Sequence, residues 1–535
     1  MVSAIVFISL RSADYLAVDG AIRPLEVYRD PHPFFHGNNH LLYPIDLLEW
    51  TCLLQALGIS PRDPFQFIAD AQAMNAVAAA GCLAMFYLFC CAATSAPVLS
   101  LCATAGYGLS NAFLLHATNS AEPMVGLLWS LVAAGAVCAS LKYNRNFLAV
   151  AGGFLVMLAM ATYQSMVLGG PGLLVLLSFW PEFRSSGVAW RARCRRILAF
   201  LAGCTVGLAV VYSSAYYFSG TQTFSQMAAR FLRLEGGQEV YGGWRAAKIV
   251  NLPVGFAVSL APVIPSDYTG LRSLLLPRYL HWITLTTAAT LVGGTWLIAL
   301  FFQVVKNWRM INEPSRVALF TCATVLVGDV FALAYWEPLY EKLWLQPLAA
   351  IFLIGAIVLA TPRFKAIRFL RPVALAVLAL MCVTNVAFAI RNHLSPTPFL
   401  QEARKVAAVI RPGDLLVGEW DNVSLLYESF LAREVNIFSV PAEAEIDGLA
   451  SLTRLNPMIA QTQRLDRQVY FLAVLDTPEA AWNAFLGDRC GLPYHSFDPY
   501  RKCTEVVEEL RLPDSTVTLR RLLGSKSCRR LAGLT

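Results

Sequence analysis

Residues 121–162 read AEPMVGLLWSLVAAGAVCASLKYNRNFLAVAGGFLVMLAMAT. Two apolar runs, 121–141 and 146–162, flank a short polar turn that carries Lys142 and Arg145. Each run has the roughly 17–25 residues that a helix needs to cross the hydrocarbon core of a bilayer. Basic residues in short loops mark the cytoplasmic side. The stretch therefore predicts a pair of membrane-spanning helices joined by a cytoplasmic turn.

The composition of the whole chain agrees with this reading. Hydrophobic residues make up 57% of the 535 residues and charged residues only 14%, whereas soluble domains carry about 25% charged residues. Lipid must therefore cover much of the protein surface. The net charge of +7 falls mainly in short loops, so it reads as an orientation signal and excludes a nucleic-acid partner.

The same hydropathy criterion predicts an all-α polytopic membrane bundle of about eleven transmembrane helices over residues 1–390. The first candidate, 2–10, is short for a crossing but is counted as a span. The other ten candidates are 67–91, 96–113, 121–141, 146–162, 163–181, 197–219, 281–304, 317–336, 343–360 and 370–390.

The orientation of these spans follows from four basic clusters that all fall on one side when the spans are counted in this way. A full span over 251–265 would move the cluster at Lys306 to the other side, and Pro253, Pro262 and Pro265 interrupt that stretch. It is therefore predicted to be re-entrant or interfacial. The clusters are Lys142 and Arg145; Arg184, Arg191, Arg193, Arg195 and Arg196; Lys306, Arg309 and Arg316; and Arg363, Lys365, Arg368 and Arg371.

Hydrophobicity falls after Ile390, which predicts a small α/β domain over 391–535 on the extracytoplasmic side. Strands are predicted at 414–419, 435–440, 469–475 and 516–522, with helices at 423–432 and after Pro478. Strand–helix–strand order favours a partly parallel sheet. The domain lacks a phosphate-binding glycine loop and a nucleophile elbow, so a packing or recognition role is favoured. In an oxidising compartment, Cys490 and Cys503 are candidates for a disulfide.

The first outer loop, 11–66, holds unusual polar groups. Asp19 follows the first span, and Asn39 and His40 lie in a dense polar run. Ionisable groups close to lipid often serve a site, although Asp19 is equally placed to cap a helix. Apolar positions at helical spacing over 43–57 predict a helix along the membrane surface. The histidines at 32, 36 and 40 are also consistent with ordinary headgroup-level residues or, with no established ligand spacing, a metal site.

Further polar residues fall in turns on the same side. His116 and Glu122 flank one turn, Gln164 begins another, and Glu337 lies in a third. A carboxylate in such a place can act as a general base, and a histidine can donate to phosphate or carry protons. The alternative for Glu337 is a simple ion pair with Lys342 or with arginine side chains.

In the layout of residues 1–390 the chain resembles the GT-C superfamily of polytopic glycosyltransferases, which includes the protein mannosyltransferases and the lipid A aminoarabinose transferases. The resemblance rests on the acid Asp19 in a long first outer loop, on 39–43 (Asn-His-Leu-Leu-Tyr) and on the Trp-Glu-Pro turn at 336–338. Many members carry a second acid beside the first, whereas Gly20 follows Asp19 here.

The resemblance implies transfer of a hexosyl or pentosyl group from a polyprenyl-phosphate donor in the bilayer to a glycan, lipid or protein acceptor. Asp19 would be the general base, and Arg23, Arg29 or His40 would hold the phosphate. The substrate cavity would also include Asn39, His116, Glu122, Gln164 and Glu337. The resemblance implies a bacterial inner-membrane protein without a nucleotide cofactor, and some relatives use a divalent metal.

Two other functions stay open from the sequence. A transporter or flippase would use a charged group within the membrane, and Asp329 lies among apolar residues in the middle of a predicted span. A non-catalytic assembly protein would use its C-terminal domain to recruit a partner, which the single acid Asp19 leaves possible.

Overall fold

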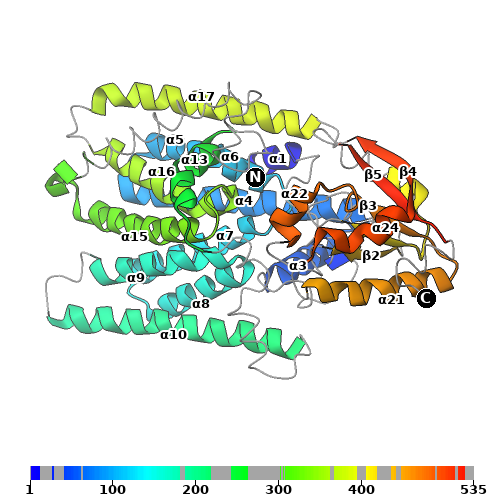
Figure 1. Ribbon diagram of the computed structural model, residues 1–535. Helices are drawn as coiled ribbons and strands as arrows, with labels where there is room; N and C mark the ends of the chain where they lie inside the picture. Colours follow the sequence, from blue (N-terminus) through cyan, green and yellow to red (C-terminus); the bar gives the residue numbers. More distant parts are fainter. Residues whose placement is uncertain are drawn as a thin grey trace. The chain divides into compact units, whose positions relative to one another are not determined.

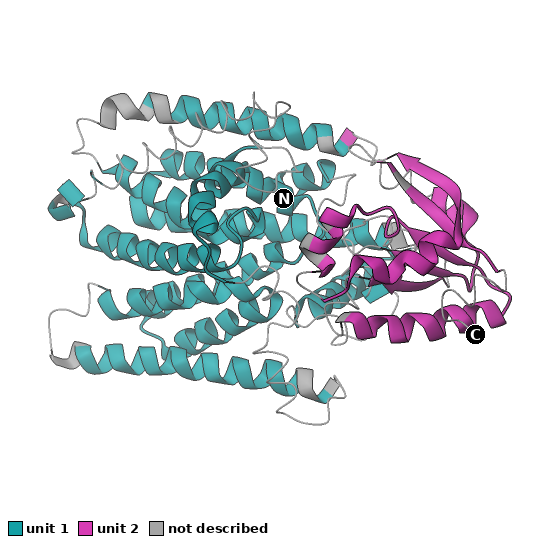
Figure 2. Cartoon of the chain, viewed as in Figure 1, with its two compact units in different colours: residues 1–393 teal, residues 394–535 magenta. Residues whose placement is uncertain are grey.

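The structure is a computed structural model that divides into two compact units, Met1–His393 and Leu394–Thr535 (Figure 2). Each is described by itself. The structure describes residues 2–11, 24, 27–28, 41–61, 64–180, 187–218, 243–262, 302, 305–306, 308–361, 367–394, 405–418, 435–440, 448–487, 491–511 and 516–524.

The regular elements among the described residues of the first unit are all helices (Figure 1). Its elements are α1 (Val2–Ser9), α3 (Tyr43–Ala56), α4 (Pro64–Thr94), α5 (Pro97–Gly108), α6 (Asn111–Ala117), α7 (Pro123–Tyr143), α8 (Asn146–Thr162), η1 (Gln164–Leu168), α9 (Gly169–Phe179), α10 (Gly187–Phe218), α13 (Ala246–Leu260), η5 (Trp308–Met310), α15 (Glu313–Tyr335), η6 (Glu341–Trp344), α16 (Leu345–Ala360) and α17 (Ile367–Leu394).

Five described helices are long and apolar enough to cross a membrane, and a bent pair brings the number to six. The membrane bundle is therefore confirmed, whereas the count of eleven spans stays a prediction. The span predicted over 281–304 lies outside the described residues. Helix α1 has 8 residues and is about 12 Å long, too short to cross by itself.

The span predicted over 96–113 is bent in the structure. Helices α5 and α6 meet there at a bend of 69°. Ser110, between them, has an extended backbone with φ −64° and ψ 150°, which ends the helical hydrogen-bond ladder. Helix α6 leaves the direction of α5 and leads into a buried polar turn.

Helices α8 and α10 lie side by side (Figure 1) because glycines let their backbones meet. A Cβ on Gly153 would lie 2.0 Å from the carbonyl oxygen of Phe200, and one on Gly203 would lie 2.0 Å from that of Val150. Small residues at such contacts are typical of helix packing in membranes, where close van der Waals contact supplies much of the attraction.

Most of the apolar stretch 251–265, which was predicted to be re-entrant or interfacial, belongs to helix α13. Its 15 residues are about 22 Å long, which is short of the roughly 30 Å hydrocarbon core. Its last carbonyls accept side-chain amides from other helices: Asn111 donates to Val258 O at 2.9 Å, and Asn385 donates to Leu260 O at 2.7 Å. Helix α13 is thus held against α6 and α17 by polar contacts.

The ends of α7 define two faces of the first unit. The helix begins after Glu122 and ends at Asn144, whose side chain accepts a hydrogen bond from Arg196. At 21 residues α7 covers about 32 Å, a full membrane thickness. The basic residues near Asn144 therefore lie far from Glu122, as the charge pattern predicts.

The second unit contains a five-stranded sheet in the order β2-β1-β3-β5-β4. Strand β1 pairs in parallel with β2 and β3, and β5 pairs antiparallel with β3 and β4, which confirms the predicted partly parallel sheet. The strands are β1 (Leu415–Gly418), β2 (Asn436–Ser439), β3 (Val469–Leu472), β4 (Thr504–Arg511) and β5 (Thr516–Leu522), with helices α21 (Ser451–Arg464), α22 (Glu479–Trp482) and α24 (Asp498–Lys502) and short turns η7 (Gly448–Ala450), η8 (Asn483–Gly487) and η9 (Tyr494–Phe497).

Helices α21 and α24 and strand β4 of the second unit are missing from the sequence prediction, and one predicted helix, 423–432, lies outside the described residues. In β4 the register shifts between Val506 and Glu508, so a bulge breaks the alternation of apolar and polar positions that marks a strand. Cys503 is disulfide-bonded. Because Cys490 lies outside the described residues, their pairing stays a prediction.

Candidate functional site

The predicted site residues fall into two groups. Asp19, Arg23, Arg29, Asn39 and His40 lie outside the described residues, so their proposed roles stay predictions. The other four, His116, Glu122, Gln164 and Glu337, belong to the first unit. They lie in or next to three segments, 116–122, 163–164 and 337–342, which the structure brings to one end of the bundle.

A buried turn between α6 and α7 forms the centre of this region. Thr118 ends α6, and Pro123 begins α7 because a helix tolerates proline in its first turn. Asn119, Ser120 and Glu122 between them have no exposed surface. Buried polar backbone needs hydrogen-bond partners, so other elements must supply them.

Helices α3 and α4 supply those partners. The Asn75 amide on α4 donates to the carbonyl oxygens of Asn119 at 2.8 Å and Ala121 at 2.6 Å. The Tyr43 hydroxyl on α3 donates to the carbonyl oxygen of Ser120. Burial, and then the charge of Glu122, raises the pKa of Tyr43 well above its ordinary value, so this hydroxyl stays a neutral donor.

The charged side chains at the turn, Lys342 and Glu122, form an ion pair. Lys342 Nζ lies 4.0 Å from Glu122 Oε1, and the lysine side chain keeps 22% of its surface exposed while the glutamate has none. The ammonium also lies 5.9 Å from the ring centre of Tyr163 and 5.8 Å from that of Tyr340. Cation–π attraction adds to the ion pair. Lys342 is therefore a partly exposed cation held beside a buried carboxylate.

Glu337 has a different environment from the one considered in the sequence. Its Oε1 accepts the backbone N–H of Leu339 at 3.3 Å, while Lys342 pairs with Glu122 instead. Lys248 on α13 lies near Glu337 and donates to the carbonyl oxygens of Tyr335 at 2.9 Å and Trp336 at 2.5 Å. The carboxylate of Glu337 thus organises its own turn, next to a lysine that caps the end of α15.

The remaining two predicted residues lie close by along the chain. His116, on the last turn of α6, is buried with 3% of its surface exposed. Gln164 begins η1 directly after Tyr163, the residue whose ring faces Lys342. Three predicted outer turns, around 116–122, 163–164 and 337–342, therefore meet at one end of the bundle.

Sequence analysis missed two residues of this region, Lys342 as a site cation and Asp46. Asp46 Oδ2 accepts a hydrogen bond from Thr162 Oγ1 at 3.2 Å. Burial raises the pKa of Asp46 to about 7. The helical spacing of the sequence could have indicated Asp46, because it falls beside Tyr43 and Leu47, which are buried on the inward face of α3.

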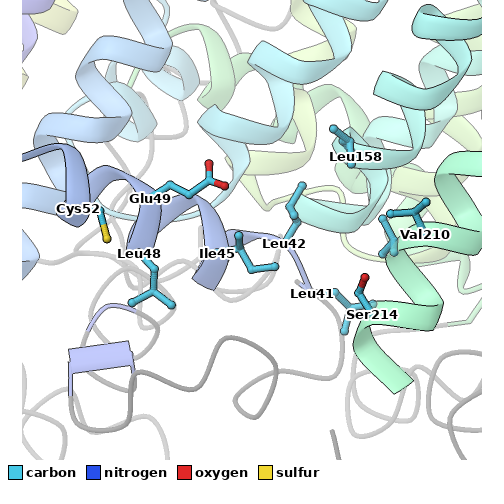
Figure 3. A pocket seen from close by; sticks show the side chains of 10 residues that line it. Leu41, Leu42, Ile45, Leu48, Glu49, Cys52, Leu158, Val210 and Ser214 are labelled. Carbon is cyan, nitrogen blue, oxygen red and sulfur yellow. The ribbon is translucent and has the colours of Figure 1, made fainter. Parts of the chain in front are cut away.

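A cavity of about 550 Å³ lies beside α3, a volume within the range of ligand pockets. Figure 3 shows side chains of α3 on one side and those of α8 and α10 on the other. Among the described residues that line it, the wall is almost wholly apolar and Glu49 is the one charged side chain. The lining residues are Leu41, Leu42, Ile45, Leu48, Glu49, Cys52, Leu158, Val210, Val211 and Ser214.

Within the described part of the chain, no group of three or more histidine, cysteine, aspartate or glutamate side chains is arranged to hold a metal ion. The histidines at 32, 36 and 40 lie outside it, so a metal site there stays a prediction.

No family model matches the sequence, and no curated protein matches it. Solved structures do. The crystal structure of ArnT from Cupriavidus metallidurans bound to undecaprenyl phosphate aligns with 12% identity and a TM-score of 0.60, covering 98% of this chain and 97% of that one. The apo structure of the same ArnT aligns with 10% identity and a TM-score of 0.58, covering 98% of each chain.

At these identities the likeness shows the fold. Both units of the chain fall within the alignment, because it covers nearly the whole length of each protein. The chain therefore shares the fold of ArnT.

Proposed function

We propose that the protein is a membrane glycosyltransferase that moves a sugar from a polyprenyl-phosphate donor to an acceptor at the extracytoplasmic membrane face. The observation that carries the proposal is the fold shared, over 98% of the chain, with an ArnT bound to undecaprenyl phosphate. The buried turn and the partly exposed ammonium of Lys342 beside it support the proposal, because such a donor presents a phosphate at the membrane surface.

The reaction mainly requires the protein to position the donor and the acceptor. The acceptor hydroxyl oxygen attacks the anomeric carbon, the bond from that carbon to the phosphate oxygen breaks, and the electron pair leaves with the phosphate. A general base removes the hydroxyl proton, and Asp19 is the candidate. Lys342 stabilises the charge that builds on the leaving phosphate. Positioning and one proton transfer thus account for the reaction.

The other candidates act as binding groups. Arg23, Arg29 and His40 in the first outer loop are proposed to share the phosphate with Lys342, and Asn39, His116, Glu122, Gln164 and Glu337 are proposed to shape the sugar and acceptor positions. The apolar cavity beside α3 has the character needed for a hydrocarbon chain. A bacterial inner membrane, with the unit 394–535 outside the cytoplasm, is the setting that the charge pattern favours.

Asp329 supports transport as a second candidate function. It lies within α15 with 3% of its surface exposed, and its Oδ2 lacks a hydrogen-bond partner among the described residues. A buried acid in a span is costly unless it serves a partner or a pathway. If the protein were a transporter, Asp329→Asn would harm function more than a change at Asp19.

The transferase proposal predicts an effect on cellular lipids. Cells of the native host that lack the protein should accumulate one polyprenyl-phosphate-linked sugar, because its consumption stops. Mass spectrometry of extracted lipids measures the accumulation and identifies the sugar. Wild-type protein should return the lipid to its normal level. An unchanged polyprenyl-phosphate pool in the deletion strain would contradict the proposal.

A further inference from the structure

Exposed cations gather at the end of α7 that lies opposite Glu122, in the turn between α7 and α8 and in the first turns of α10. The segments that carry them, 140–147 and 187–200, contain no aspartate and no glutamate. Among the described residues, none of these exposed cations forms an ion pair with an acid. We call them the basic rim: Lys142, Arg145, Arg191 and Arg195.

A buried arginine joins the two segments of the basic rim. Arg196 on α10, with 2% of its surface exposed, donates a hydrogen bond to the side-chain oxygen of Asn144 in the turn. Asn144 follows the last residue of α7 in the left-handed conformation, with φ 55° and ψ 44°, which asparagine tolerates at the end of a helix. The turn and α10 therefore hold the rim's cations in a fixed relation to each other.

The contacts between α8 and α10 show how far the start of α10 projects. Gly203 lies against Val150, and Gly207 lies against Met157. The numbers rise together along both helices, so the two helices run in the same direction. With this register the start of α8 lies beside Arg196, and the earlier residues of α10 extend past the end of α8.

The basic rim covers the depth at which lipid headgroups lie. Arg195 is level with the turn, and Arg191 lies one helical turn, about 6 Å, further from the bundle. A headgroup layer is about 5–8 Å deep on each side of the hydrocarbon core. Trp190 and Tyr143, beside the rim, expose 64% and 59% of their surfaces. Exposed tryptophan and tyrosine side chains are typical of the boundary between lipid and water.

Exposed apolar side chains continue from the rim toward the middle of the bundle. On α10, Leu198 lies on the same face as Arg191 and Arg195, because steps of four and three residues keep to one side of a helix. On α8, Phe147 and Val150 are exposed three residues apart. A phosphate followed by hydrocarbon chains, which is the order of groups along a phospholipid, matches this arrangement.

We propose that the basic rim binds the headgroup of an anionic phospholipid, whose acyl chains lie along Phe147, Val150 and Leu198. The phosphate accepts charge-assisted hydrogen bonds from the guanidinium and ammonium groups. Basic groups between membrane helices are known to recognise such headgroups. The bound lipid bridges α10 and the turn before α8. The site lies at the other end of α7 from Glu122, so it is separate from the proposed sugar transfer.

Lipid titration of the full-length protein in an uncharged detergent, followed by native mass spectrometry, tests the site. Phosphatidylglycerol should bind roughly 25-fold or more tightly than phosphatidylcholine with the same acyl chains, because each nearby basic group contributes about a fivefold factor. Arg191→Gln with Arg195→Gln should lower the affinity for phosphatidylglycerol about 25-fold by removing two of these groups. Its affinity for phosphatidylcholine should equal that of the wild type.

Lys306→Gln with Arg309→Gln is the matched control. It removes two exposed cations from another basic segment and changes the net charge equally, yet it should keep the wild-type affinity for phosphatidylglycerol. Equal losses in the two double variants would show a general attraction to positive charge and overturn the proposal. Unchanged affinity in Arg191→Gln with Arg195→Gln would also overturn it. Should that variant fail to fold, Lys142→Gln with Arg145→Gln replaces it with the same expectation.

The deacylated headgroup, glycerophosphoglycerol, distinguishes a lipid site from a site for a soluble phosphate. It carries the same charge as phosphatidylglycerol but lacks the chains that contact α8 and α10. At an equal concentration it should leave phosphatidylglycerol bound. Displacement of the lipid under these conditions would show that the rim recognises the phosphate alone, and the lipid site would be refuted.

Discussion

Asp19→Asn should lower the rate of sugar transfer by roughly a thousandfold, because a positioned general base contributes about 10²–10⁴-fold. Asparagine keeps the size of the side chain but cannot take the proton of the acceptor hydroxyl. The measurement is turnover of the polyprenyl-phosphate-linked sugar by membranes that contain equal amounts of wild-type and variant protein. The variant should insert and unfold like the wild type.

Asp30→Asn, in the same loop, is the matched control and should retain activity. Full activity in Asp19→Asn would remove Asp19 from the mechanism and make Glu26 and Asp30 the next candidates. Loss of activity in both variants would point to the charge of the loop and not to a single base.

Lys342→Met should have two separate effects. Affinity for a polyprenyl phosphate should fall about 10- to 100-fold, which corresponds to one charge-assisted hydrogen bond. Stability should fall by about 3 kcal/mol, because the buried carboxylate of Glu122 loses its ion-pair partner. Binding is measured by titration of the purified protein with the lipid, and stability by its thermal unfolding.

The double variant Lys342→Met with Glu122→Gln separates these effects. With the carboxylate neutralised, most of the lost stability should return, while the affinity for the lipid phosphate should stay low. Recovery of both properties would show that Lys342 serves only to neutralise Glu122. Wild-type affinity in Lys342→Met would exclude it from the phosphate site.

Hydropathy and basic loops predict much of the membrane unit because lipid imposes these patterns on each helix separately. The predicted span over 121–141 and the observed α7, Pro123–Tyr143, differ by only two residues at each end. The break at Ser110 does not show in the hydropathy, because Ser110 and Asn111 are polar residues within a stretch that is apolar on average. The bulge in β4 hides that strand in the same way, since it interrupts a local period.

The candidate site is only partly predictable because it depends on contacts between distant segments. Counting the predicted spans places His116, Glu122, Gln164 and Glu337 on one side of the membrane, and this placement stays a prediction. The pairing of Lys342 with Glu122, and not with Glu337, depends on how η6 packs against the turn before α7. Asp46 lies on the inward face of a predicted helix, but its hydrogen-bond partner Thr162 cannot be predicted from the sequence, because the contact depends on how α3 packs against α8.

The placement of this polar region outside the cytoplasm is the claim on which the proposed function depends. A reporter that is active only outside the cytoplasm, fused after Thr535 of the full chain, tests it most directly. The account predicts an active reporter in intact cells, and no activity when a reporter that works only in the cytoplasm takes its place. The reverse pattern would put the buried turn, with Glu122 and Lys342, on the cytoplasmic face and contradict the proposed transfer.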